Sequence, residues 1–283
     1  MTMVQTEEAP MRTAAPRASR RASKILGTAA RKYGSAIVLG VVLVTVWEIA
    51  ARNRWVSPFV LPAPSAIWDT MVENLANGLY WHHLLATMWA ASLGFVIAAA
   101  AAIILAGLLV SIPPLRTAIF PYVVAFQTLP KVAVAPIVVL WLGFGQIAKL
   151  FIVVFVCFFP ILINALEGLE IRDRDKLELF QSAGANRWQL FIGLRVPGAL
   201  PSIFAGLHIG AVFALLGAVV AEFVGTREGL GYLLLLEKSQ FNVPGVFVIL
   251  VLLMVIGLVL SWLMRFLESK VSWSKGLDSK AMV

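Results

Sequence analysis

The sequence of 283 residues is 60% hydrophobic and only 13% charged, with a mean hydropathy of +0.89. This composition excludes an ordinary soluble domain and indicates a protein that crosses a membrane. The net charge of +8 does not indicate a nucleic-acid partner, because the basic residues flank hydrophobic segments, as they do in oriented membrane proteins. The single cysteine, Cys157, lies in an apolar run and excludes a disulfide within the chain.

Residues 1–34 carry seven Lys and Arg and no sustained apolar face, which predicts a basic, disordered cytoplasmic tail. The next apolar run, about 35–51, is expected to be an uncleaved first membrane span. An external segment containing several prolines completes this region, 35–80. The adjacent His82 and His83 would point in different directions on a helix and have no third ligand nearby, so we expect no metal site.

Residues 84–115 contain no charge and exceed the roughly 20 residues that a spanning helix needs. The following span, 117–142, is interrupted by three prolines, among them Pro130. A helix broken at membrane depth is tolerated only where protein or a water-filled cavity covers its backbone. The break therefore predicts a solute pathway at Gln127, Thr128 and Lys131.

Lys131 leaves two interpretations open. A charged side chain at mid-membrane is costly and is a functional candidate by default, here to attract an anionic solute. Alternatively the helix ends near Leu129, and the lysine only reaches the outer headgroups.

The longest polar interval between apolar runs predicts two short helices joined by a glycine. Asp175 is expected to begin the first in a capping box, and Gly184 is suited to end it in the left-handed conformation. Asn186 with Gln189 predicts a second capping box, and Pro197 is expected to close the second helix.

This interval resembles the cytoplasmic coupling loop of ABC importer permeases, with the motif Glu-Ala-Ala-x3-Gly-x9-Ile-x-Leu-Pro. Glu178, Gly184 and Pro197 stand at the motif spacing, whereas Leu179 and Phe180 replace the two alanines and imply a differently shaped socket on the partner. The resemblance implies a coupling loop over 172–201. It assigns contact with an ATPase subunit to Glu178, Leu179, Phe180, Ala183, Gly184, Ala185, Asn186, Arg187, Trp188 and Pro197.

A second phrase, which begins at Gln127 and continues to Gly145, resembles the nitrate, sulfonate and taurine branch of these permeases. The resemblance covers about residues 61–264. It implies the type I importer fold, all-α with six membrane spans, in which residues 81–267 form the transmembrane core.

The remaining spans are expected at 149–166, 203–224 and 246–264, with 222–242 outside the membrane and a cytoplasmic tail at 268–283. Small residues recur along the fifth span and allow two helices to approach closely. We expect helix packing at Gly206, Gly210 and Gly217.

The basic residues predict the orientation. Of the 23 Lys and Arg, 17 lie in intervals assigned to the cytoplasm and 6 in intervals assigned outside. This asymmetry favours both termini and the coupling loop inside a bacterial inner membrane.

Motifs for catalysis are absent from the sequence. There is no Gly-x4-Gly-Lys-Ser/Thr phosphate loop and no plausible catalytic cluster, so we expect neither a catalytic residue nor a cofactor. The resemblance implies a homodimeric permease, served by two cytoplasmic ABC ATPase subunits and an external solute-binding protein.

The solute is expected to be a small anion of the sulfonate, taurine or nitrate kind. A thiamine-precursor-like or other small organic solute is the alternative. An ion-coupled secondary transporter would need coupling residues at mid-membrane or an inverted repeat, and the sequence shows neither. An intramembrane enzyme would need a catalytic cluster, which is also absent from the sequence. A purely structural scaffold would not need a span broken by proline.

Overall fold

The structure, a computed structural model, describes residue 34 and residues 37–170 and 174–271. It consists of two compact units, Met1–Pro64 and Ser65–Val283. In the first unit a helix covers residues 37–52, with most of its apolar side chains exposed. Trp47 Nε1 donates a hydrogen bond of 3.0 Å to the carbonyl oxygen of Pro62, which holds the proline-containing segment to this helix.

The described part of the second unit is built from helices and turns alone. The helices are α2 Pro64–Ala76, α3 Leu79–Ser111, α4 Pro113–Thr128, α5 Lys131–Leu142, α6 Gln146–Leu169, α7 Arg174–Ser182, α8 Arg187–Leu190, α9 Val196–Gly225, α10 Leu230–Ser239 and α11 Val243–Val271. A π-helical turn, Phe191–Arg195, joins α8 to α9.

Among the described residues, α3, α6, α11 and the α8–α9 segment are long and apolar enough to cross a membrane. α4 and α5 meet the same criteria only as a pair, with a bend of 98° between them, which is the form of a broken span or of a re-entrant loop. The protein is thus an all-α, polytopic membrane protein. The predicted count of six spans depends on the helix at 37–52, whose preceding residues lie outside the described part.

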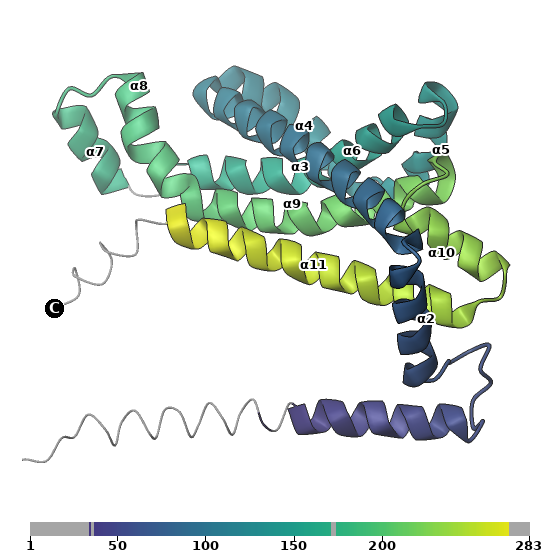
Figure 1. Ribbon diagram of the computed structural model, residues 1–283. Helices are drawn as coiled ribbons and strands as arrows, with labels where there is room; N and C mark the ends of the chain where they lie inside the picture. Colours follow the sequence, from purple (N-terminus) through teal and green to yellow (C-terminus); the bar gives the residue numbers. More distant parts are fainter. Residues whose placement is uncertain (1–33, 35–36, 171–173, 272–283) are drawn as a thin grey trace, which may run out of the picture. The chain divides into compact units, whose positions relative to one another are not determined.

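The centre of the second unit is the packing of α6 against α3 and α9 (Figure 1). α3 turns small residues inward, and five of its alanines are fully or almost fully buried: Ala90, Ala91, Ala98, Ala102 and Ala106. Gly206, Gly210 and Gly217 of α9 lie against α6 so closely that an added Cβ would come within 2.7 Å of Asn164, 2.6 Å of Ile161 and 3.1 Å of Val153. Small residues therefore bring these helices together by close backbone approach.

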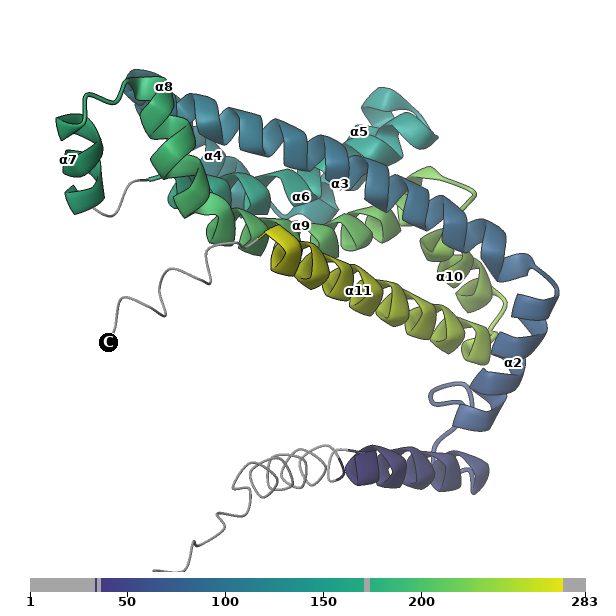
Figure 2. The ribbon, with the colours of Figure 1, turned by 60° about the vertical axis from the view of Figure 1, so that its left-hand side comes forward.

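The two ends of this bundle differ (Figure 2). α7 and α8 lie at one end, with the last turns of α3, α6 and α11. α10 lies at the other, with the first turns of α3, α6 and α11. We call these the α7–α8 end and the α10 end.

Two helices extend beyond the spans predicted for them. Glu222 was expected in an external loop, but α9 continues to Gly225 and buries the Glu222 side chain. The last helix extends beyond the predicted span on both sides, from Val243 to Val271.

Candidate functional site

The segment from α7 to α8, which we call the coupling hairpin, has a defined turn. α7 ends at Ser182, and Gly184 takes the left-handed conformation with φ of 75°. The amide of Ala185 donates back to the carbonyl oxygen of Phe180 at 3.0 Å, which satisfies a carbonyl at the helix end. Gly184 thus ends the first helix as predicted. Asp175 lies in the first turn of α7, so its predicted position before the helix is wrong.

The predicted capping box of the second short helix is confirmed. The side chain of Asn186 accepts a hydrogen bond of 2.8 Å from the backbone amide of Gln189. The Gln189 side chain accepts one of 2.9 Å from the Asn186 amide. Two N–H groups that the helix itself cannot satisfy are therefore paired, and this fixes the direction in which α8 leaves the turn.

Pro197 does not close this helix, contrary to expectation. The chain passes from α8 through the π-helical turn directly into α9, and Pro197 lies in the first turn of that helix. A proline has no N–H to donate, and the π-helical turn lies just before it, so the backbone is already irregular where that donor is missing. The coupling hairpin is consequently continuous with a membrane-spanning helix.

The coupling hairpin exposes large apolar side chains. Leu179 is 67% exposed and Trp188 is 70% exposed, and the Trp188 ring stacks on Phe191 with a centroid distance of 6.1 Å. Phe180 turns the other way, and its ring lies 3.1 Å from the position of an added Cβ on Gly193. The two substituted alanine positions of the motif therefore differ, since Leu179 faces out and Phe180 holds the hairpin to the π-helical turn. The other predicted coupling residues Glu178, Ala183, Asn186 and Arg187 are exposed, and Ala185 is partly buried.

Two polar contacts join this end to the bundle. A guanidinium N–H of Arg195, in the π-helical turn, donates to the carbonyl oxygen of Val110 in α3 at 3.1 Å. Arg116, near the start of α4, forms an ion pair with Glu170 just after α6. The coupling hairpin is thus continuous with α9, and the π-helical turn that follows it is hydrogen-bonded to α3 through Arg195.

The predicted pathway residues lie at the break between α4 and α5. Gln127 and Thr128 are exposed, and the Thr128 hydroxyl donates to the Ala125 carbonyl oxygen within its own helix. Lys131 is half-buried at the start of α5, and its ammonium group is 3.4 Å from the Gln127 carbonyl oxygen. The break thus presents an exposed amide, a hydroxyl and an ammonium group together.

Lys131 also lies over an aromatic ring of α9. Its Nζ is 6.0 Å from the centroid of Phe213. At about 1.5 Å per residue, Phe213 is about 18 Å from the Gly225 end of α9. The ammonium group is therefore nearer to the middle of this helix than to the α10 end.

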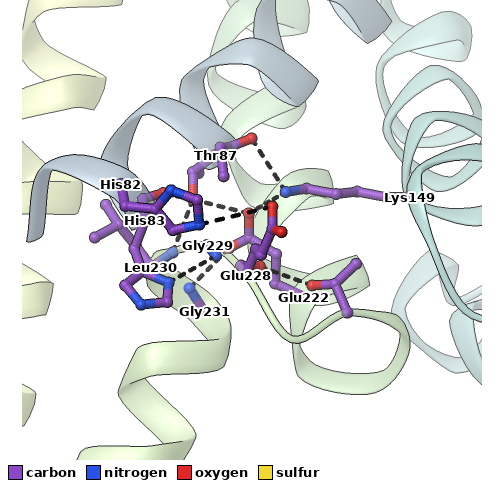
Figure 3. A network of polar contacts seen from close by, with 11 residues as sticks. His82, His83, Thr87, Lys149, Glu222, Glu228, Gly229, Leu230 and Gly231 are labelled. Atoms are coloured by element: carbon purple, nitrogen blue, oxygen red, sulfur yellow. Dashed lines mark hydrogen bonds and ion pairs between the residues drawn. The ribbon is translucent and has the colours of Figure 1, made fainter. Parts of the chain in front are cut away.

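A buried polar cluster that was not predicted from the sequence lies at the α10 end (Figure 3). Lys149 Nζ lies 2.7 Å from Glu222 Oε1, and both side chains are fully buried. Lys149 also donates to the Ala86 carbonyl oxygen at 3.1 Å. The Thr87 hydroxyl lies 2.8 Å from Glu222 Oε1. The sequence did contain a signal for this contact. Lys149 and Glu222 carry opposite charges, and both were assigned to the outer side of the membrane.

The same cluster binds the start of α10. A helix cannot satisfy its own first N–H groups, and here three consecutive ones find partners on α3 and α9. The acceptors are His83 Nδ1 for the Gly229 amide at 3.1 Å, Thr87 Oγ1 for the Leu230 amide at 2.8 Å, and Glu222 Oε2 for the Gly231 amide at 2.7 Å. His83, for which the sequence predicted only the absence of a metal site, is thus a capping residue. The described residues contain no group of three His, Cys, Asp or Glu side chains placed to hold a metal ion.

Comparison with known proteins places the chain in a family. Residues 98–273 match the family described as the binding-protein-dependent transport system inner membrane component. The chain is 38% identical over 216 residues to the formylaminopyrimidine transport permease protein ThiX of Halalkalibacterium halodurans, which covers 76% of this chain and 86% of ThiX. It is 38% identical over 226 residues to the riboflavin transport system permease protein RibX of Chloroflexus aurantiacus, which covers 80% of this chain and 84% of RibX.

A solved structure shares the fold. It is the MetNI methionine ABC transporter in inward-facing conformations, with a TM-score of 0.52 at 20% identity over 69% of this chain and 93% of that chain. At this identity the likeness shows the fold alone. The family and the fold agree with the helices described above, and the relatives are transport permeases rather than enzymes. The chain belongs to the permease subunits of binding-protein-dependent ABC importers.

Proposed function

We propose that two copies of this chain form the membrane pathway of an importer driven by two cytoplasmic ABC ATPase subunits and loaded by an external solute-binding protein. The family implies such partners in general terms. The 17 to 6 distribution of Lys and Arg supports a cytoplasmic α7–α8 end and an outer α10 end, with both termini inside a bacterial inner membrane.

The observation that carries this proposal is the exposed apolar surface of the coupling hairpin. Leu179 and Trp188 expose about two thirds of their area on a segment whose other side chains are mostly polar. Exposed apolar surface rimmed by polar residues is typical of sites that contact a protein partner or a membrane, and on a segment assigned to the cytoplasm we take the partner to be a protein. The Asn186 capping box and the Gly184 turn hold these side chains on a stiff support.

The geometry supports a mechanism of coupling. Closure of the ATPase subunits on ATP would press on Leu179 and Trp188. Because α8 continues through the π-helical turn into α9, the push would travel along a membrane-spanning helix rather than into a loop. Arg195 carries the same displacement to α3. The helices would thereby rock between inward-facing and outward-facing arrangements.

For the solute, two classes are supported by different observations. The names of ThiX and RibX refer to formylaminopyrimidine and riboflavin, and this favours a nitrogen heterocycle as the solute of this chain. Lys131, with its charge near the middle of α9, favours a small anion of the sulfonate, taurine or nitrate kind. We take the heterocycle as the first candidate and the anion as the second.

Reconstitution tests the proposed function. The purified chain in proteoliposomes is expected to show no ATP hydrolysis. Addition of its ATPase subunit should give hydrolysis that the solute-loaded binding protein stimulates, together with solute uptake. A thermal-shift screen of that binding protein against heterocycles and sulfonates identifies the solute. ATP-independent uptake that follows an ion gradient would instead support a secondary transporter.

A further inference from the structure

The buried cluster at the α10 end also constrains the turn that precedes α10. Thr226–Glu228, which we call the rim turn, joins the end of α9 to the residues that the cluster binds. The Thr226 hydroxyl donates to the Glu228 carbonyl oxygen at 2.8 Å, so the turn is closed on itself. Just before it, the Gly225 carbonyl oxygen accepts a 3.0 Å hydrogen bond from the amide of Gly145 in the α5–α6 turn.

The rim turn lines two cavities at this end. One, of about 700 Å³, is lined by the α5–α6 turn and by the residues from Val224 to Glu228. The other, of about 370 Å³, is lined by Glu228 and by side chains of α3 that include His82 and Trp89. Glu228 and Gln146 contribute to both cavities. The position of the rim turn therefore sets the shape of this surface.

The cluster fits closely around the Glu222 carboxylate. A Cβ added to Gly229 would lie 2.1 Å from this group, and one added to Gly231 would lie 2.7 Å from the Val219 carbonyl oxygen. No alternative residue fits at either position without displacing its neighbours. The start of α10 therefore packs against α3 and α9 in a single position.

The charges favour the same arrangement. The carboxylate faces the first amides of α10, where the helix dipole is positive, and Lys149 balances its charge from α6. A buried ion pair is tolerated only when further hydrogen bonds satisfy its remaining atoms, and the partners here come from α3 and α10. Four helices meet at this one cluster.

We infer that Thr87, Lys149 and Glu222 are positioning residues that hold the rim turn in place to receive the solute-loaded binding protein. They are buried and touch neither the solute nor the binding protein, so they act through the rim turn. This inference rests on the proposed function, in which the α10 end is the outer side. It explains why a fully buried ion pair lies beneath a turn whose Arg227 is exposed to the outside.

Thr87 offers the sharpest test, because Thr87→Val keeps the shape of the side chain and removes only its hydroxyl. That change deprives the Leu230 amide of its acceptor and Glu222 of a donor. Thr87→Ser restores the hydroxyl and serves as rescue. Thr117→Val is the matched control, because the Thr117 hydroxyl bonds only within its own helix, to Pro113 at the α7–α8 end.

The first readout is independent of transport. A nitroxide is attached at Arg227→Cys in the full-length chain, on a Cys157→Ser background, and its mobility is measured by EPR. We expect increased mobility in Thr87→Val and the parent spectrum in Thr87→Ser and Thr117→Val. An unchanged spectrum in Thr87→Val would overturn the inference, whether or not the chain is an importer.

The second readout uses the reconstituted complex with its ATPase subunit and binding protein. The concentration of loaded binding protein that gives half-maximal stimulation should rise about tenfold in Thr87→Val, because the buried Leu230 amide is left without its acceptor and Glu222 without a donor. The maximal rate should stay within about twofold, because the coupling hairpin is far from the change. A fall in the maximal rate alone would mean that the cluster stabilises the fold without positioning the rim turn. Absence of any stimulation in the parent would count against the proposed function, and the EPR result would still decide the position of the rim turn.

Discussion

Lys149 of α6 and Glu222 of α9 form a fully buried ion pair, with Nζ 2.7 Å from Oε1. Burial of two charges is costly, and the pair is retained where hydrogen bonds satisfy both groups. Here the carboxylate also binds the Gly231 amide and the Thr87 hydroxyl, so one side chain joins three other helices.

Removal of one partner from this pair should be far more damaging than removal of both charges. Lys149→Met leaves the carboxylate buried without a counter-charge, and we expect a loss of about 3–5 kcal/mol in stability. Lys149→Met combined with Glu222→Gln should recover at least half of that loss. Thermal unfolding in detergent measures the effect, and Lys238→Met, at an exposed lysine of α10, is the control. Additive losses in the double variant would show that the two residues do not interact.

Gly184 should be required for its backbone conformation rather than for lack of space. No atom lies within 4 Å of an added Cβ, but φ is 75°. Gly184→Val should therefore introduce strain of about 1–2 kcal/mol and displace the coupling hairpin, whereas Gly184→Asn tolerates this conformation. Stimulated ATP hydrolysis and uptake should fall in the valine variant and persist in the asparagine variant, with normal membrane insertion in both. Wild-type rates in Gly184→Val would refute the coupling role.

Lys131 should matter through its charge if the solute is an anion. Lys131→Gln removes the charge and keeps length and polarity, while Lys131→Arg keeps the charge over Phe213. Uptake of the anion should fall in the glutamine variant and persist in the arginine variant, and rising salt should reduce the difference between them. Equal uptake of the anion by both variants would leave the heterocycle as the candidate solute. It would also show that Lys131 does not select the solute by its charge.

The orientation can be tested at the coupling hairpin. On a Cys157→Ser background, Ser182→Cys at the exposed end of α7 should react with a membrane-impermeant thiol reagent only after the cells are opened. Arg227→Cys in the rim turn should react in intact cells. Reaction of Ser182→Cys in intact cells would reverse the assigned topology.

The sequence predicted the features that depend on local patterns. Asn186 and Gln189 have the spacing of a capping box, and Gly184 ends the helix before them; both were predicted because each involves neighbours a few residues apart. Pro197 was misassigned because a proline is common both just after a helix and in the first turn of the next one. In the structure the π-helical turn connects α8 to α9, so Pro197 lies in the first turn of α9.

The buried cluster could not be predicted in the same way. Thr87 and Glu222 are 135 positions apart, and their contact exists only because α3 and α9 pack at the same end of the bundle. Lys149 at the start of an apolar helix looked like an ordinary residue at a span's end. Only the fold shows that its ammonium group turns inward to Glu222 instead of toward the headgroups.

Binding of the ATPase subunit to the coupling hairpin tests the central claim most directly. The affinity of the purified ATPase subunit is measured for the parent chain in nanodiscs and for Leu179→Ala/Trp188→Ala. Phe241→Ala, which removes an equally exposed aromatic ring at the α10 end, is the control. We predict that the double variant binds the ATPase at least about tenfold more weakly, because exposed aromatic anchors dominate such interfaces, and that Phe241→Ala binds like the parent. Parent affinity in Leu179→Ala/Trp188→Ala would contradict the proposal that the coupling hairpin receives the ATPase.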